Sequence, residues 1–547
     1  MNEDALRALR RTRQRHRLGN IEWFDAAYRA YLVGLFGGGS VLWISSSVHD
    51  EALGAAAIAD IARNGPSIIG LVTALALLAG LRGGAQGGPI ALETADVVHV
   101  MLSPVDRRRA LLRPALQRVR GAMFLGATVG AIAGQLAGRR LPGSLSAWAG
   151  GGALFGVATA MLWAGAALLA HTLGCPRWIA TSSGIGVVVW QTVAIFQSGR
   201  TGGIAGPADS FGSLAMWGWR QRPIDLVAVA VALVAVTAGL LTLGRISLEA
   251  LARRSALVAQ LRFAVTMQDL RTVILLRRQL NQEQARRRPW RKSGATSGRG
   301  VTRAVWSRGW HGLLRFPATR LVRIGALAAL FGVLQATVVR GTTPAVLASA
   351  LVAFVIGLEV MEPLSQEVDQ PDRTDSFPID RGELLARHLL APTIALIPFA
   401  AVAAVAAVLV LGSADAIVPA AIFALPNLVA GSAGGVVSIV RDAPDPIKTE
   451  RQQSFVPPEM AGLGATLRLL LPVIVSTFGT STVFFLRAAA DAGESLIAAA
   501  VRGALGSALL ALLVGYWVKV RDRVRRRIRA FMDEGRAQAL GTTRLAR

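Results

Sequence analysis

The sequence predicts an all-α polytopic membrane protein, and three observations support this fold class. The chain has 547 residues, of which 53% are hydrophobic and only 17% are charged, whereas a soluble domain carries about 25% charged residues. The hydrophobic residues gather in runs of about 20, which is the length a helix needs to cross a bilayer. Lys and Arg exceed Asp and Glu by 59 to 33, giving a net charge of +26, and most of these cations lie between the runs.

About twelve transmembrane helices are expected. In chain order they are 27–46, 66–84, 120–138, 147–170, 179–197, 223–243, 322–339, 343–361, 390–412, 415–438, 465–486 and 496–518. The clearest are the sixth and the ninth, and the least clear are the first and the fifth; the composition supports ten to twelve. The first span follows a basic stretch, as in a secretion signal, but no small-residue cleavage site follows it, so we expect it to be retained.

The positions of the basic residues predict the orientation of the chain. If the N-terminus is cytoplasmic and twelve spans alternate, most cations fall on the cytoplasmic side, chiefly in 82–120, 245–323 and 519–547. Cytoplasmic loops carry such an excess of Lys and Arg, and basic segments next to a membrane attract anionic lipids. We therefore expect a multi-pass protein of the cell membrane with both termini in the cytoplasm.

A short internal repeat divides the chain. Residues 103–113 read SPVDRRRALLR and residues 377–387 read FPIDRGELLAR, about half a chain further on. Each copy follows the second span of its half and precedes the third, which favours two fused six-span halves. The expected divisions are an N-terminal half (1–243), a basic linker with amphipathic helices (244–321), a C-terminal half (322–518) and a basic tail (519–547).

Each copy of the repeat has the features of a helix start. Proline suits the first turn of a helix because its missing N–H is not needed there, and aspartate is favoured at the positive end of the helix dipole. The Arg and Leu residues that follow predict a short amphipathic helix in a loop. One interpretation is a solvated connector between two spans, and the other is a docking helix that transmits force from a soluble motor.

The pattern L-S-P-[VI]-D-R-x-x-L-L after the second span resembles permease subunits of bacterial ABC exporters, in particular large actinobacterial permeases with two fused halves. The segment 257–280, LVAQLRFAVTMQDLRTVILLRRQL, is similar to the same group. The resemblance implies that the loop between spans two and three contacts a dimer of separate ATPase subunits. The implied docking residues are Pro104, Asp106, Arg107, Leu111, Pro378, Asp380, Arg381 and Leu385. The second copy departs from the first, because Gly382 and Glu383 replace Arg108 and Arg109.

The chain lacks the motif needed to hydrolyse ATP itself. A P-loop needs Gly-Lys followed by Ser or Thr, and the lysines here are Lys292, Lys448 and Lys519, none of which follows a glycine. We therefore expect no enzymatic activity and no cofactor in this chain, with ATP and Mg bound by a partner subunit. The glycine-rich stretch 83–88 is interpreted as a flexible segment that follows the second span.

The central segment is expected to contain an amphipathic helix over 247–280 at the membrane surface or under the ATPase. A basic flexible linker (286–303) should follow it, and then an interfacial lead-in to span seven with Trp306 and Trp310. Nucleic-acid binding is the rival interpretation of the arginines, but membrane topology already explains basic inner loops.

Trp217, Trp219 and Arg502 are weaker candidates for function. The two tryptophans precede span six, where aromatic residues anchor helices at the interface, and a role in closing an outer gate is the alternative. Arg502 lies within the last span, where a cation is a functional candidate, although an anchor at the helix end is the simpler reading. Neither histidines nor cysteines stand at metal-ligand spacing, and Cys175 is the single cysteine.

Three classes of function remain open. The first is the membrane subunit of an ATP-driven exporter, whose nearly uncharged spans suit an apolar or amphiphilic small molecule, peptide or lipid. The second is an ion-coupled secondary transporter, which also commonly has two halves but usually needs carboxylates within the membrane. Glu359, Glu362 and Asp225 lie only at the ends of spans. The third is a membrane-embedded enzyme or an assembly protein with no transport activity, and an enzyme would need a cluster of His, Asp or Glu that the sequence does not show.

Overall fold

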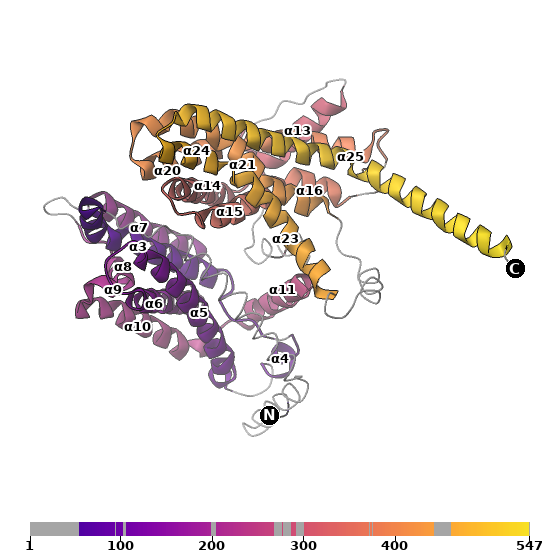
Figure 1. Cartoon of the computed structure of the whole chain (residues 1–547). Helices are drawn as coiled ribbons and strands as arrows, with labels where there is room; N and C mark the ends of the chain where they lie inside the picture. The colour runs from indigo at the N-terminus through magenta and orange to yellow at the C-terminus, as the bar shows by residue number, and fades with distance from the viewer. Residues whose placement is uncertain are drawn as a thin grey trace. The chain divides into compact units, whose positions relative to one another are not determined.

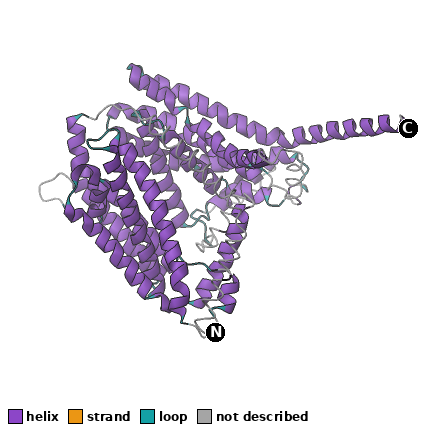
Figure 2. Cartoon of the chain, turned by 60° about the horizontal axis from the view of Figure 1, so that its bottom comes forward, coloured by secondary structure: helices purple, strands orange, loops and turns teal. Residues whose placement is uncertain are grey.

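A computed structural model describes most of the chain as helix. The described residues are 54–92, 94–101, 106–197, 204–266, 286–291, 300–370, 376–441 and 461–545, with residues 12, 276, 372 and 374. No strand occurs among them, as Figure 2 shows. They form two compact units: unit 1 is Met1–Thr266 with Thr272–Gln282, and unit 2 is Met267–Arg271 with Glu283–Arg547. The division falls inside the central segment 244–321.

Unit 1 is organised around α6, Leu145–Thr172 (Figure 1). This helix packs against three long helices, α3, α5 and α10, and α7 packs against α3. Their bounds are Ala55–Ala85 for α3, Arg107–Gly138 for α5, Arg177–Gln197 for α7 and Val227–Leu241 for α10. Shorter helices complete the unit, namely α4 (Thr94–His99), α8 (Asp209–Ala215), α9 (Trp217–Arg220) and α11 (Leu248–Thr266).

Small residues allow α5 and α6 to approach closely. A Cβ atom added to Gly130 would collide with the carbonyl oxygen of Gly152, and one added to Gly152 would collide with the carbonyl of Gly130. Helices in lipid gain little from burying apolar surface, so close backbone contact through small residues is their main means of association. Glycines of α5 and α6 thus allow the backbones of these two helices to come into contact.

Unit 2 is organised around α21, Ile417–Val440, in a similar way (Figure 1). This helix packs against α15, α20, α23 and α25, while α14 packs against α15 and α20. The bounds are Ala318–Val339 for α14, Ala345–Val360 for α15, Ile397–Leu411 for α20, Ala461–Thr480 for α23, Val483–Ala492 for α24 and Leu496–Leu545 for α25. Shorter helices are α13 (Val301–Leu313), α16 (Glu362–Val368), α18 (Arg381–Arg387) and α19 (Leu390–Ala395).

The described residues include nine helices that are long and apolar enough to cross a membrane, or up to eleven if each of two bent pairs is one span. The chain is therefore a helical, multi-pass membrane protein. Each predicted span from 66–84 onward overlaps one of these helices or pairs. The first predicted span, 27–46, lies outside the described residues.

The two bends occur where proline begins a helix. The chain turns by 62° between α15 and α16 and by 44° before α20. Pro363 and Pro398 stand in the first turns of α16 and α20. Proline cannot donate the backbone hydrogen bond that would continue the preceding helix. The ninth predicted span is therefore broken rather than straight, and the chain bends sharply where the eighth ends.

The structure differs from the sequence predictions at three further points. The segment 107–113 is no separate loop helix but the start of α5, which continues into the third span. The basic tail continues the last span within the single helix α25. Residues 286–291 are not simply linker: the backbone N–H of Arg286 donates to Arg315 at 2.9 Å, and that of Trp290 to Leu314 at 3.0 Å. Backbone hydrogen bonds thus hold part of the linker against the entry to α14.

Candidate functional site

The first repeated segment forms the start of α5. Asp106 is the N-cap, and its carboxylate accepts a hydrogen bond from the backbone N–H of Arg108 at 3.0 Å. The Nε of Arg109 lies 3.6 Å from the same carboxylate, and the Asp106 and Arg109 side chains are 55% and 64% exposed. Arg107 is exposed as well, so this turn directs its charges outward. Pro104 lies outside the described residues.

Leu111 anchors this turn in unit 1. Its side chain is 1% exposed and packs in a buried cluster with Leu243, Ile246 and Leu251. Leu251 belongs to α11, so the central segment contributes to the base of α5. Burial lowers the pKa of Arg254 on the same helix, and the charge of Arg118 lowers it further. The start of α5 is therefore a fixed, strongly basic surface with one capping carboxylate.

The second repeated segment is engaged by the C-terminal helix. Asp380 precedes α18, and its carboxylate pairs with Arg523 at 3.0 Å and with Arg526 at 3.3 Å, both on α25. The Asp380 side chain is 21% exposed, against 55% for Asp106. No capping hydrogen bond to the Asp380 side chain is formed. Leu385 is buried like Leu111, Arg381 is half-buried and Pro378 is exposed.

Gly382 explains why the two copies of the repeat differ. A Cβ atom at this position would collide with the backbone carbonyl of Lys519 in α25. The equivalent residue in the first copy is Arg108, which is exposed. The second copy thus needs a glycine because α25 passes directly over it. Sequence reasoning found the repeat but missed this contact, since no local pattern links α18 to a helix more than a hundred residues away.

A group of charged side chains is buried in unit 2 near the same segment. Arg320 pairs with Glu359 at 3.1 Å and also with Glu362, and Arg323 pairs with Glu359 at 2.9 Å. Arg320 and Glu359 are each 4% exposed. The guanidinium of Arg320 also stacks on the ring of Phe316. Two of the three carboxylates that the sequence placed at the ends of spans, Glu359 and Glu362, are therefore paired with arginines, whereas the third, Asp225, is buried in unit 1 at 4% exposed.

A second buried carboxylate, Glu367, lies on α16. Its partners are Arg308 at 3.2 Å, His388 at 3.6 Å and the hydroxyl of Thr374 at 3.3 Å. Among the described residues, no group of three His, Cys, Asp or Glu side chains is arranged to hold a metal ion. These charges join α13, α16 and α18 to each other, which fixes the helices around the second repeated segment.

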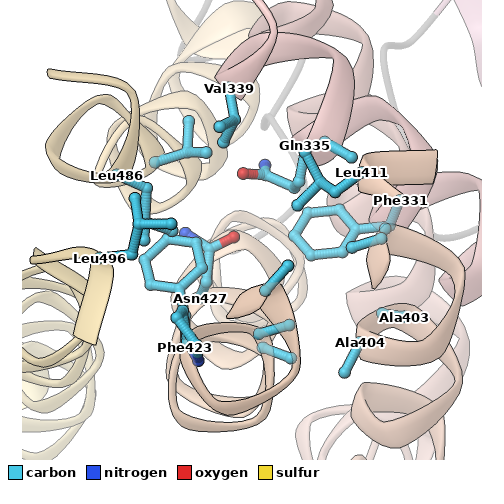
Figure 3. A pocket seen from close by; sticks show the side chains of 18 residues that line it. Phe331, Gln335, Val339, Ala403, Ala404, Leu411, Phe423, Asn427, Leu486 and Leu496 are labelled. Carbon is cyan, nitrogen blue, oxygen red and sulfur yellow. The ribbon is translucent and has the colours of Figure 1, made fainter. Parts of the chain in front are cut away.

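Unit 2 also contains an apolar pocket, shown in Figure 3. It comprises about 600 Å³ of space, open solvent included, between α14, α20, α21, α24 and the start of α25. Its wall consists mainly of alanine, leucine, valine and phenylalanine, with Phe331, Phe423 and Leu486 as large members. The polar side chains in this wall are Gln335 and Asn427, and none of the lining residues is charged.

The amide of Asn427 has a determined orientation. Its Nδ2 donates to the carbonyl of Gly479 at 3.2 Å and to the hydroxyl of Thr482 at 2.9 Å. A carbonyl can only accept, so the nitrogen faces it and Oδ1 points away. No described donor reaches this Oδ1, although Asn427 is fully buried.

Gln335 repeats this arrangement on the other side of the pocket. Its Nε2 donates to the hydroxyl of Ser349 at 2.9 Å, and that hydroxyl donates its own proton to the carbonyl of Val346. The Oε1 of Gln335 has no donor in the described part of the chain, and Gln335 is 6% exposed. A buried acceptor without a donor costs about 1–3 kcal/mol, so two such oxygens beside one pocket call for an explanation.

Comparison with known proteins places the chain in a family. The profile of DUF6297, described as a family of unknown function, matches residues 60–446, which is more than half of the 547 residues. The chain belongs to the DUF6297 family. No curated protein and no solved structure matches it.

The DUF6297 match includes both repeated segments and the buried charges of unit 2. It also includes most of the pocket wall, with Gln335 and Asn427. The pocket residues of α24 and α25, and the arginines that hold Asp380, lie beyond residue 446. The candidate sites of this chain therefore combine helices inside and outside the DUF6297 region.

The remaining candidates lie apart from these sites. Trp217 and Trp219 are on α9 and half-buried, and Trp217 packs against the buried cluster that contains Phe211 and Leu214. Arg502 is exposed near the start of α25 and lies 3.3 Å from Glu494. Trp217 and Trp219 belong to unit 1 and Arg502 to unit 2, and a role in an outer gate stays a prediction.

Proposed function

We propose that this chain is the membrane subunit of an ATP-driven exporter, energised by separate ATPase subunits that dock on residues 103–113 and 377–387. The observation that carries the proposal is the form of α5. Its exposed, charged first turn at Asp106 continues without a break into a long apolar helix. A push on that turn would move the span itself, because a continuous helix transmits force better than a loop.

The two docking surfaces would be used differently. Asp106 and its neighbours are exposed, whereas Asp380 is already paired with two arginines of α25. An ATPase at the second surface would meet α18 and α25 together. ATP and Mg would be bound by two copies of this partner and not by the present chain.

We also propose that the chain consists of two related six-span halves. The packing of the helices supports this: α6 contacts α3, α5 and α10, and α21 contacts α15, α20 and α25. In both units the second span of the half also contacts the fifth, as α3 with α7 and α15 with α23. The proposed location is the cell membrane, with both basic termini in the cytoplasm beside anionic lipids.

An ion-coupled secondary transporter is the alternative, and the buried carboxylates of Glu359 and Glu367 favour it. Both are paired with arginines in unit 2. A coupling carboxylate must gain and lose a cation, and a fixed arginine partner opposes that exchange. The exporter proposal is therefore preferred.

The test of the exporter proposal is co-purification of the full-length chain with a P-loop ATPase encoded in an adjacent reading frame. We expect a stable complex whose ATPase activity depends on this chain. Asp106→Ala should weaken the complex, and adding Asp380→Ala should weaken it further. The control is Glu494→Ala, which removes an exposed carboxylate just before α25 begins, whereas Asp380 contacts Arg523 and Arg526 much further along that helix. A double variant that keeps full binding and coupling would show that these segments are not docking surfaces.

A further inference from the structure

Two buried hydrogen-bond acceptors belong to residues that line the apolar pocket of unit 2. The oxygens of Gln335 and Asn427 lack donors among the described residues, while their nitrogens are occupied by Ser349, Gly479 and Thr482. Figure 3 shows both amides extending from opposite walls toward the space between the helices. The rest of the wall is hydrocarbon.

We infer that this pocket binds a neutral, apolar molecule carrying a hydrogen-bond donor, a hydroxyl or an amide N–H. The donor would lie against Oε1 of Gln335 and Oδ1 of Asn427, while the body of the molecule fills the space lined by Phe331, Phe423 and Leu486. A pocket that is mostly apolar and carries a few placed polar groups is typical of sites for small molecules.

The chemistry of the wall excludes charged occupants. No lining residue carries a charge, so an ion would lose its hydration without gaining a counter-ion. A carboxylate would also face two acceptor oxygens, which repel it. A pure hydrocarbon fits the wall but leaves both oxygens without donors. A neutral molecule with one or two donors satisfies both requirements.

The position of the pocket agrees with a binding site in the path of a transported molecule. It lies in the halves of α14 and α20 that are distant from α16 and α18, and so away from the proposed docking surface. In naming the class of cargo, this inference rests on the proposed export function. The binding itself needs no ATPase.

The experiment compares two photoreactive probes on the full-length chain in lipid nanodiscs. One is a ten-carbon alcohol with a diazirine in its chain, and the other is its methyl ether, which lacks the donor. Labelled peptides are located by mass spectrometry. We expect the alcohol to label α14, α20 or α21 roughly tenfold more than the ether, the factor that one net hydrogen bond supplies.

Variants test whether the preference for the alcohol over the ether depends on the oxygens of Gln335 and Asn427. Gln335→Met and Asn427→Leu keep the side-chain volume but remove the acceptor, and each should reduce alcohol labelling toward the level of the ether. Gln366→Met, which changes an exposed amide of α16 in the same unit, should leave labelling unchanged. Ala404→Phe fills the pocket without changing either amide and should abolish labelling by both probes. This variant tests the site even if the amide variants do not fold.

Two results would overturn the inference. Equal labelling by alcohol and ether in the unaltered chain would mean that water or lipid chains occupy the site and that the oxygens select nothing. Undiminished alcohol labelling in a folded Ala404→Phe variant would place the probe elsewhere. Because no ATPase is present, either result leaves the docking proposal untouched, and failure of the docking test leaves this binding site standing.

Discussion

Glu359 pairs with two arginine side chains in the interior of unit 2. Arg320 approaches it at 3.1 Å and Arg323 at 2.9 Å, and Glu359 is 4% exposed. Taking such charges out of water is costly, and only their mutual pairing compensates for it. The group therefore matters less for the net stability it adds than for the penalty that appears when one partner is removed.

We expect Glu359→Gln to destabilise the protein by about 3 kcal/mol, because Arg320 and Arg323 would both lose a buried carboxylate partner. Arg320 would retain Glu362, which limits the loss. Thermal unfolding of the full chain in detergent measures the change. The control is Glu494→Gln, since Glu494 pairs with Arg502 on the surface and such a pair contributes under about 1 kcal/mol. Equal effects of both variants would contradict a buried role for Glu359.

At the scale of elements, the α5–α6 pair depends on glycine. Gly152 faces the backbone of α5, whereas Gly150 on the same helix has open space around its Cα. Gly150 and Gly152 therefore form a matched pair: the same substitution on one helix meets a neighbouring backbone in one case and nothing in the other.

We expect Gly152→Ala to lower the unfolding temperature of unit 1, since the new methyl group would force α5 and α6 apart. Gly150→Ala should instead raise it slightly, because alanine favours a helix over glycine by up to ~1 kcal/mol. The two unfolding midpoints are compared in the same detergent. If Gly152→Ala behaved like Gly150→Ala, the close contact of the two helices would be wrong.

Helix boundaries were harder to predict than helix positions. The third span was expected to begin at 120, but α5 begins at Arg107. Its first turns carry several arginines. These residues are unfavourable inside a membrane, but they are compatible with a helix. Hydropathy therefore marks where a helix enters hydrocarbon and not where it starts. The same reason explains why α25 runs through the predicted basic tail.

At the scale of the whole molecule, the proposed orientation is directly measurable. On a background of Cys175→Ala, we expect Ser144→Cys, Ser413→Cys and Ser495→Cys to react with a membrane-impermeant maleimide on intact cells. Ser247→Cys should react only after permeabilisation. All four serines are exposed. The first three lie in loops that the basic residues assign to the outside, and the last lies in the central basic segment.

The reverse labelling pattern would invert the orientation and place the Asp106 surface outside the cell. A docking role for that surface with a cytoplasmic ATPase would then be impossible. A mixed pattern would instead contradict the alternation of spans. Labelling of each cysteine in permeabilised cells is the control, because a buried thiol would react under neither condition.

The sequence by itself determined that this is a helical membrane protein, which segments from residue 66 onward are long and apolar enough to cross a membrane, and where the repeat lies. Hydrophobic length and charge position are local properties, and a bilayer acts on them directly. Only the tertiary structure decided that α25 covers Gly382 and pairs with Asp380, that Glu359 is held by arginines, and that Gln335 and Asn427 meet across one pocket. These contacts join residues distant in the chain, and their geometry depends on how whole helices pack.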